Sequence, residues 1–470
     1  MRKSLIALAA ASLLSACASA GAVPEATMPP TAAGGFVGAD ATLFAASEPP
    51  AGWWRLFDDP QLDALVTEAL AGNKDLEIAA ANLARVRASL GEARAGRLPS
   101  TTTSGGASYG RQAATVTPGV TGPLEAAESY SAGLDVSYEV DIFGRVRNSI
   151  AAARADVGAA QAALDTARVS VAAETARAYA DACAANTRIA VAERSVALQE
   201  RTVSLTERLL RAGSGTGLDV ARASSALHAV EAGLPPLRAA REEAVFRLAT
   251  LTGRTPVQAS EEARACAAIP QVETTIPVGE GAGLLARRPD VRQAERQLAA
   301  SAARVGVAVA SLYPQVVLGG SLGVTALDIG DLASSEAVRF SVGPLISWSF
   351  PNVAVARARI AAARAGADVS LAQFDRTVLV ALQEVETALS AYANELDRRA
   401  ALQSARDESA EAVRLARLRF DAGMDSFLIV LDAERTLAND EALLAQAQAQ
   451  AATNQVQLFK ALGGGWQEQP

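Results

Sequence analysis

Polar and apolar residues alternate in two parts of the chain. Over residues 130–140 and again over 340–350, the even-numbered positions are apolar or aromatic and the odd-numbered ones are mostly Ser, Gly, Asp or Glu. A period of two is that of a β-strand with two different faces. Strands are also predicted at 101–109 and 315–324, so each part carries one hairpin, with loops at roughly 110–128 and 325–338.

A helical period governs the segments before these strands. Residues 60–98 place apolar side chains on one helical face, with a predicted break at Gly72-Asn73 and an end at Pro99. The part after the break recurs over 289–312, and Pro314 closes that copy.

Two further segments, 146–211 and 353–421, contain no proline and are predicted to be long helices. At about 1.5 Å per residue the first would extend about 99 Å. Apolar residues recur every seven positions from Ile150 to Ala178 and then in a shifted frame to Leu210, as in coiled coils with a stutter. The sequence therefore predicts long helices that pack against neighbours.

Each long helix is predicted to turn at a glycine and to come back. The turns fall at Gly213 and Gly423, and the returning helices run through 217–253 and 426–463. Only the first return contains Pro235-Pro236, which should kink or interrupt it.

These elements occur in two copies of one unit. Shifting residues 75–99 by 215 positions, or residues 130–253 by 210, aligns like residues, for example Tyr138 with Trp348 and Gly253 with Gly463. The five-residue change of offset falls in the hairpin loop. Copies of this length indicate an internal pseudo-twofold rather than a solenoid.

The aromatic residues favour a membrane position for the hairpins over a half-buried sheet of a soluble protein. Tyr130 and Tyr138 are eight residues apart, about 26 Å along a strand, which a tilt of about 40° shortens to roughly 20 Å. This approximates the apolar band of an outer-membrane barrel between its aromatic girdles. Phe340 and Trp348 are expected at the same two levels.

Four strands cannot close a barrel, since about eight strands is the smallest closed size and lipid tolerates no open sheet edge. The chain is therefore expected to oligomerise. A trimer would supply about twelve strands and a dimer about eight, and both are even numbers within the known range. The sequence predicts a mainly α protein with a membrane β-barrel, in which each chain contributes four strands and long coiled-coil helices.

The first residues have the pattern of a signal peptide. Arg2 and Lys3 precede an apolar run, which ends in Leu14-Ser15-Ala16-Cys17. The last four residues resemble a bacterial lipobox, which would make Cys17 the first, lipidated (diacylated and palmitate-bearing) residue of the mature chain. Ordinary cleavage between Ala16 and Ala20 is the alternative.

The predicted organisation follows from these segments. It comprises a signal peptide (1–16), a lipidated N-terminal tether (17–52), a first repeat (53–256), a linker (257–288), a second repeat (289–466) and a short tail (467–470). Residues 18–52 are rich in Ala, Pro and Gly without a regular period, so ordered structure is expected to begin at Trp53.

Composition excludes several classes of protein. The formal net charge is −8 and no basic run exceeds two residues, so a nucleic-acid partner is not expected. No stretch of about twenty uncharged apolar residues is present, so no transmembrane helix is predicted. Beyond Cys17 the chain has only Cys183 and Cys266. A disulfide between them is allowed in the periplasm, but isolated buried thiols are the expected state.

No catalytic or metal site is expected. His228 is the only histidine and should have a surface or packing role. The stretch 213–217 is rich in glycine like a phosphate loop, but it joins two helices and should be a turn. Without a His or Cys cluster, the sequence predicts no zinc site, no Cys-His nucleophile and no cofactor.

A set of motifs in a fixed order resembles the TolC-like outer membrane factors, most closely the NodT branch of lipidated efflux channels. The resemblance covers about residues 53–466. The motifs are Trp53-Trp54 with Phe57, Leu234-Pro235-Pro236-Leu237, Arg287-Arg288-Pro289-Asp290 with Ala294-Glu295, Tyr313-Pro314, and the end from Leu458 to Gly465-Trp466.

The resemblance implies a homotrimeric duct with a barrel of twelve strands, surrounded by outer-membrane lipid, and a helical barrel across the periplasm. Transport would be passive, with energy from an inner-membrane pump joined through a periplasmic adaptor protein. The adaptor would contact the helical tips at Gly213 and Gly423.

The resemblance also assigns a periplasmic gate to Leu428 and Asp432, which lie one helical turn apart. Three copies would stack a leucine ring on a carboxylate ring, where the like charges would repel and favour a bound cation. Alternatively, Leu428 is a coiled-coil core residue and Asp432 a solvated charge. Asp432 aligns with Arg222, so we expect only the second hairpin to line the constriction.

Two other functions remain open from the sequence. The chain could be the outer channel of a type I protein-secretion system, although the lipobox and the Gly-Gly-Gly-Trp end favour efflux. A structural periplasmic coiled-coil lipoprotein would explain the helices and Cys17 but not two amphipathic hairpins.

Overall fold

The computed structural model describes residues 26–111, 125–350 and 353–464. The chain forms two compact units, each built from both predicted repeats. The strand unit comprises Leu83–Ala160 and Ala294–Phe374, and the helical unit comprises Met28–Asn82, Gln161–Gln293 and Asp375–Pro470. Cys17 and the predicted signal peptide lie outside the described residues.

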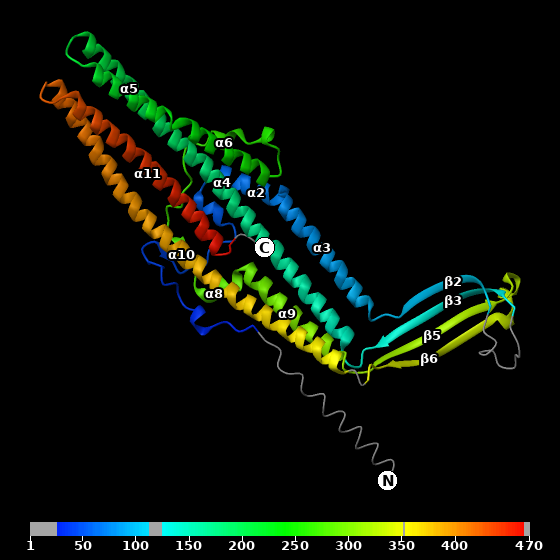
Figure 1. Cartoon of the computed structure of the whole chain (residues 1–470). Helices are drawn as coiled ribbons and strands as arrows, with labels where there is room; N and C mark the ends of the chain where they lie inside the picture. The colour runs from blue at the N-terminus through cyan, green and yellow to red at the C-terminus, as the bar shows by residue number, and fades with distance from the viewer. Residues whose placement is uncertain (1–25, 112–124, 351–352, 465–470) are drawn as a thin grey trace. The chain divides into compact units, whose positions relative to one another are not determined.

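The strand unit contains a four-stranded antiparallel sheet in the order β2-β3-β5-β6 (Figure 1). All four predicted strands are confirmed. Their bounds are β2 (Ser100–Gly110), β3 (Ala127–Val140), β5 (Gln315–Ala326) and β6 (Val338–Ser347), with short 3₁₀ helices η6 (Ile329–Ala333) and η7 (Ser335–Ala337) between the last two.

The strand register places the alternating residues of the sequence on two faces. Leu322 of β5 lies opposite Leu134 of β3 and opposite Phe340 of β6. Most apolar residues of three strands thus share one face, while the other face is mainly Ser, Thr and Gly and also carries Asp135, Glu139 and Arg339. Strand β2 contributes threonine, glycine, alanine and one tyrosine to the apolar face, in register with the even-numbered residues of β3.

The long helices follow the predicted segments. Helices α3 (Lys74–Ala95), α4 (Arg145–Arg211), α9 (Pro289–Ala310) and α10 (Val353–Asp421) each contribute residues to both units. The predicted break before α3 and the ends before Pro99 and Pro314 are confirmed. Among the described residues, no helix has the length and apolarity needed to cross a membrane.

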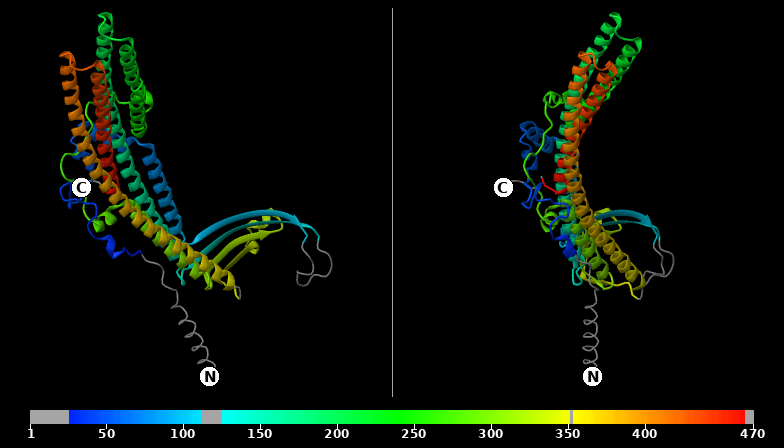
Figure 2. Two further views of the ribbon diagram at one scale, coloured as in Figure 1. Left: turned by 60° about the vertical axis from the view of Figure 1, so that its left-hand side comes forward. Right: turned by 90° about the vertical axis from the view of Figure 1, so that its left-hand side faces the viewer.

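In the helical unit, the two returning helices differ as expected. The first is interrupted, with α5 (Gly217–Glu231) ending before α6 (Leu234–Leu251), and Pro235 and Pro236 lie in the first turn of α6, where a missing N–H is tolerated. The second is the single helix α11 (Phe427–Ala461). Figures 1 and 2 show α11 running beside α10 and α4.

Shorter elements complete this unit. They are η2 (Pro30–Ala32), β1 (Phe44–Ala45), η3 (Trp53–Phe57), α2 (Pro60–Gly72), η5 (Pro256–Gln258), α7 (Glu261–Arg264), β4 (Ile276–Pro277) and α8 (Gly281–Arg287).

The expectation that ordered structure begins at Trp53 is wrong. Phe36 and Phe44 are buried in the main core of the helical unit, and β1 pairs in parallel with β4. Glu386 of α10 accepts hydrogen bonds from the backbone N–H groups of Val37 and Gly38 at 2.7 and 2.9 Å. Residues 28–52 are therefore part of the folded unit. A few separate contacts hold this segment, and such contacts leave no periodic pattern in the sequence.

The core joins the first and last motifs of the chain. The Trp53 ring is fully buried and stacks on Phe459 of α11, with ring centroids 4.9 Å apart. The neighbouring Trp54 donates its indole N–H to Asp63 at 2.8 Å. Aromatic stacking thus connects the first and the last motif within one core.

The pseudo-twofold is visible in how the two returning helices end. Arg288 donates to the carbonyl oxygen of Ala461 at 2.8 Å, and the aligned residue Asn73 donates to the aligned carbonyl of Leu251 at 2.9 Å. These groups satisfy carbonyls that a helix C-terminus leaves without partners. Gly463 follows with a φ of +67°, where a Cβ atom would meet the Arg288 side chain at 2.8 Å, so glycine is required.

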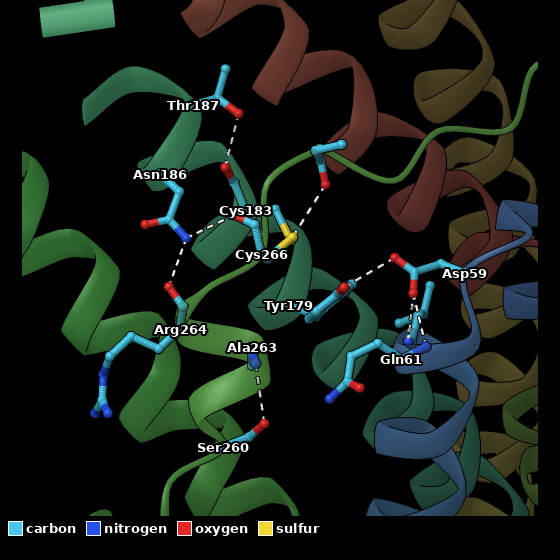
Figure 3. The surroundings of a disulfide bond; sticks show 12 residues. Asp59, Gln61, Tyr179, Cys183, Asn186, Thr187, Ser260, Ala263, Arg264 and Cys266 are labelled. Carbon is cyan, nitrogen blue, oxygen red and sulfur yellow. Dashed lines mark hydrogen bonds between the residues drawn. A yellow bond between two sulfur atoms is a disulfide. The ribbon is translucent and has the colours of Figure 1, made fainter. Parts of the chain in front are cut away.

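The expectation of separate thiols is wrong, because Cys183 and Cys266 form a disulfide (Figure 3). The bridge joins α4 to the segment after α7, across a sequence separation of 83 residues. Beside it, the side-chain amide of Asn186 donates to the carbonyls of Arg264 and Cys266 at 2.8 and 2.9 Å. The segment 264–266 is thus fixed to α4 by covalent and hydrogen bonds.

Candidate functional site

Both helical hairpins turn at the predicted glycines. Gly213 and Gly423 have φ values of +77° and +71°, which favour glycine. In the first turn the N–H of Ser214 donates to the carbonyl of Leu209, and in the second the N–H of Met424 donates to that of Arg419. This pattern ends a helix with its last carbonyls satisfied.

Beyond the shared glycines, the two tips are stabilised differently. At the first tip, Thr216 and Asp219 form a capping box at the start of α5. Hydrogen bonds from Thr216 lower the pKa of Asp219.

At the second tip, Arg419 and Asp425 form a two-pronged ion pair across the turn, at 2.5 and 3.0 Å. The hydrogen bonds from Arg419 lower the pKa of Asp425. The aligned positions in the first copy are Leu209 and Gly215, so only the second turn is closed by charge.

The predicted gate residues both lie on the exposed side of α11. Leu428 is 46% exposed, whereas its neighbours Phe427 and Val430 are buried against α10 and α4. Within one chain Leu428 is therefore not a core residue of the coiled coil. Asp432 is exposed one turn further and pairs with Arg435 at 2.6 Å. The sequence-based assignment did not anticipate this arginine partner.

The aligned residues of the first hairpin are also exposed. Leu218 corresponds to Leu428 and is 57% exposed, and Arg222 takes the place of Asp432. Each hairpin thus presents a leucine near its tip, but the two present opposite charges.

Sequence reasoning missed a buried carboxylate close to the gate. Glu434 is 1% exposed and accepts a hydrogen bond from the Thr202 hydroxyl of α4 at 2.8 Å. It also forms an ion pair with Arg417 of α10 at 2.6 Å. One side chain of α11 therefore joins α4 and α10. The signal was present, since Glu434 continues the core spacing of Phe427 and Val430.

Three of the predicted aromatic residues, Tyr130, Tyr138 and Phe340, lie on the apolar face of the sheet, and Trp348 directly follows the end of β6. Phe340 is 78% exposed in the single chain, and Trp348 donates its indole N–H to the Leu312 carbonyl at 3.1 Å. Tyr130 and Tyr138 lie on the same face of β3. Tyr130 aligns with Phe340 in the repeat, yet Phe340 is in register with Leu134, four residues further along β3.

The shift of four residues between Tyr130 and Leu134 accumulates over the two steps from β3 to β5 and from β5 to β6. It therefore amounts to two residues for each neighbouring pair of strands. With about 3.3 Å per residue and about 4.8 Å between strands, it corresponds to a strand inclination of roughly 50° if equivalent residues have equal heights. A shear of this kind accompanies the tilted strands of closed barrels.

The remaining candidate residues do not form a reactive site. His228 is exposed and its Nδ1 lies 2.9 Å from Glu231. The stretch 213–217 connects α4 to α5. Within the described ranges, no group of three or more His, Cys, Asp or Glu residues is placed to hold a metal ion.

Comparison with known proteins identifies the fold. The sequence profile of the outer membrane efflux proteins matches residues 65–254 and 283–464, which is most of the chain. The chain belongs to the outer membrane efflux protein family.

The relatives are similar over nearly their whole length. The chain is 33% identical to the pyoverdine export outer membrane protein OpmQ of Pseudomonas aeruginosa over 425 residues, which are 88% of this chain and 87% of that protein. It is 31% identical to the solvent efflux pump outer membrane protein SrpC of Pseudomonas putida over 418 residues, with the same coverage. The solved structure of the outer-membrane channel OprN matches 95% of this chain and 99% of its own, with 38% identity and a TM-score of 0.88.

The outer membrane efflux proteins are outer-membrane channels, and this chain has their mainly helical fold with a four-stranded sheet. The resemblance inferred from the motifs is therefore confirmed, together with the outer-membrane location and the role in efflux. The family is one of transport ducts.

Proposed function

We propose that three copies of this chain form the passive exit duct of a tripartite efflux system. The observation that carries this proposal is the sheet, which has one apolar and one polar face and leaves β2 and β6 with one neighbour each among the described strands. In lipid every backbone N–H and C=O group needs a partner. Pairing β6 of one copy with β2 of the next supplies these partners.

Barrel size favours three copies over two, because a barrel of about eight strands is filled by its own side chains. Three chains contribute about twelve strands, which leave an aqueous lumen lined by the polar face. The inclination of roughly 50° inferred from the register is close to the range of about 35–45° for such barrels. Tyr130, Tyr138, Phe340 and Trp348 would then form the two aromatic girdles, and lipid on Cys17 would add an anchor in the same membrane.

The helical tips are the proposed periplasmic end. The turns at Gly213 and Gly423 would contact a periplasmic adaptor protein, which connects the duct to an inner-membrane pump. Leu428 and Asp432 would form the closed gate, since both side chains are exposed in the single chain and available to face the axis. Arg435 then acts as a local counter-ion for the carboxylate ring.

The transported compounds are proposed to be small organic molecules. The relatives SrpC and OpmQ are named for solvent efflux and pyoverdine export, and both kinds of cargo are small molecules.

Single-channel conductance in planar bilayers tests the proposal, with the oligomer mass measured in the same detergent. We expect trimers with small or flickering currents that grow in Asp432→Ala. The matched control is Arg222→Ala, the equivalent position of the first hairpin, which should leave the currents unchanged. Monomers that give no current would exclude the duct, and equal currents in wild type and Asp432→Ala would exclude the gate.

A further inference from the structure

The interruption between α5 and α6 lies beside a cavity that the transport function does not explain. The cavity has a volume of about 540 Å³ and is bounded by α4, α5, α6 and α11. Gly233 and Pro236, at the break itself, form part of its wall. The break between α5 and α6 therefore borders a pocket of the helical unit.

The wall of this cavity is mainly apolar and carries positive charge. Alanine, valine, leucine and proline supply most of the lining. The charged side chains in the wall are Arg188 and Arg435, and no aspartate or glutamate lines it. A cationic ligand would thus be repelled by the arginines of the wall, whereas an anionic ligand would be attracted to them.

One buried polar atom in the wall lacks a partner. Gln199 is 1% exposed, and its Oε1 has no hydrogen-bond partner among the residues that the structure describes. A buried hydrogen-bond acceptor without a donor is unfavourable. The site should therefore bind a ligand that carries a donor group much more tightly than a similar ligand that lacks it. The ligand should therefore carry an O–H or N–H group.

The second polar anchor lies at the other end of the same helical face. Arg188, Ser195 and Gln199 of α4 line the cavity at helical spacing. Gln199 is eleven residues from Arg188, which is about 16 Å along the helix axis. Arg188 is half-buried, and no ion pair among the described residues includes its guanidinium. By contrast, Arg435 is already paired with Asp432.

We propose that this cavity binds a small, elongated, mainly apolar organic acid with a hydroxyl group at the end remote from its carboxylate. The Gln199 amide, which is covered in the ligand-free protein, turns toward the ligand so that its Oε1 accepts a hydrogen bond from the hydroxyl. The carboxylate pairs with Arg188, and the apolar middle packs on the alanine and valine side chains. Pockets of this size with few polar anchors are typical small-molecule sites. The site is in the wall of the helical unit, so it does not depend on the proposed gate or on transport.

The test uses isothermal titration calorimetry of the purified full-length channel in lipid nanodiscs. The probe is 3-(4-hydroxyphenyl)propanoate, and 3-phenylpropanoate differs from it only by the missing hydroxyl. We expect one site per chain and at least about tenfold tighter binding of the hydroxylated acid. Gln199→Leu should abolish this preference, and Arg188→Gln should weaken binding of both acids at least about tenfold.

Two further variants make the test decisive. Ala442→Phe places a phenyl ring in the cavity, where it competes with the ligand, without changing either polar anchor. This variant should abolish binding, so the proposal does not depend on the folding of Gln199→Leu. Ser409→Ala, at the position of the second repeat aligned with Gln199, should change nothing. Equal binding of the two acids, no binding, or binding that survives Ala442→Phe would overturn the proposal. So would an experimental structure, determined with the probe, in which only water contacts Gln199.

Discussion

At the scale of single residues, the buried carboxylates of Glu434 and Asp165 in the helical unit have different surroundings. Glu434 is held by a hydroxyl of α4 and a guanidinium of α10. Asp165 is also buried and lies 3.2 Å from Arg168, but burial outweighs this arginine and raises the pKa of Asp165. The Glu434 carboxylate connects three helices, whereas burial of the Asp165 carboxylate disfavours its charged form.

Replacing Glu434 with alanine should destabilise the packing of α4, α10 and α11. The substitution leaves the buried Thr202 hydroxyl without its acceptor, while the half-exposed Arg417 can be hydrated. We expect a loss of about 1–3 kcal/mol, seen as a lower melting temperature of the purified channel. Glu434→Gln retains an acceptor for Thr202 and should lie between wild type and alanine. Identical melting of all three proteins would mean that the contact contributes nothing.

The raised pKa of Asp165 predicts a pH-dependent effect of Asp165→Asn. Because the folded-state pKa exceeds the unfolded value of about 3.9, folding takes up a proton between the two values and wild-type stability falls as pH rises through the folded pKa. The asparagine variant does not titrate there. Its melting temperature relative to wild type should therefore be higher at pH 7 than at pH 4.

The control for this measurement is Asp397→Asn, which changes an exposed aspartate of α10. Its melting temperature should follow that of wild type at both pH values. If Asp165→Asn behaves in the same way as Asp397→Asn, then burial of Asp165 carries no penalty for its charged form.

At the scale of elements, the sequence predicted the strands and helices because their signals are local. Period-two alternation located β3 and β6, and prolines marked the ends of α3 and α9. The turns at Gly213 and Gly423 were predictable since the repeat shows the same glycine twice. Such signals depend only on neighbours in the chain.

The missed features depend on contacts between distant residues. Phe36 and Phe44 are single anchors in an irregular segment, so no period reveals that they join the core. The pair of Asp432 with Arg435 is the exception, because a spacing of three residues on one helix is a local signal that the sequence contains. The strand register, which sets the stagger of Phe340 against Tyr130, requires pairing across strands.

The disulfide belongs to the same group, since no spacing rule connects two cysteines separated by 83 residues. Closing a loop of this length restricts the unfolded chain, and the entropic model gives about 4–5 kcal/mol of stabilisation. Reduction should therefore lower the melting temperature of the wild-type channel. The double variant Cys183→Ala/Cys266→Ala should melt at the lower temperature with or without reductant. A wild-type channel that is unaffected by complete reduction would contradict this role.

At the scale of the whole molecule, the proposed duct requires one face of the sheet to contact lipid and the other to contact water. The register assigns Val342 to the apolar face and its neighbour Ser341 to the polar face, where the Ser341 hydroxyl lies 2.7 Å from that of Ser321. Adjacent residues of β6 therefore give a matched pair of positions with opposite surroundings. This pair distinguishes a membrane barrel from a sheet that is solvated on both faces.

Introducing arginine at each position tests the membrane barrel directly. Val342→Arg places a charge in the apolar band and should cost about 2–4 kcal/mol per chain, which three copies multiply. Ser341→Arg directs the same charge into the proposed aqueous lumen, where it remains hydrated. We expect Val342→Arg to reduce the yield of trimers in the outer-membrane fraction strongly, while Ser341→Arg assembles normally and alters ion selectivity. Equal assembly of the two variants would mean that the apolar face does not contact lipid, and the proposed arrangement of the duct would then be wrong.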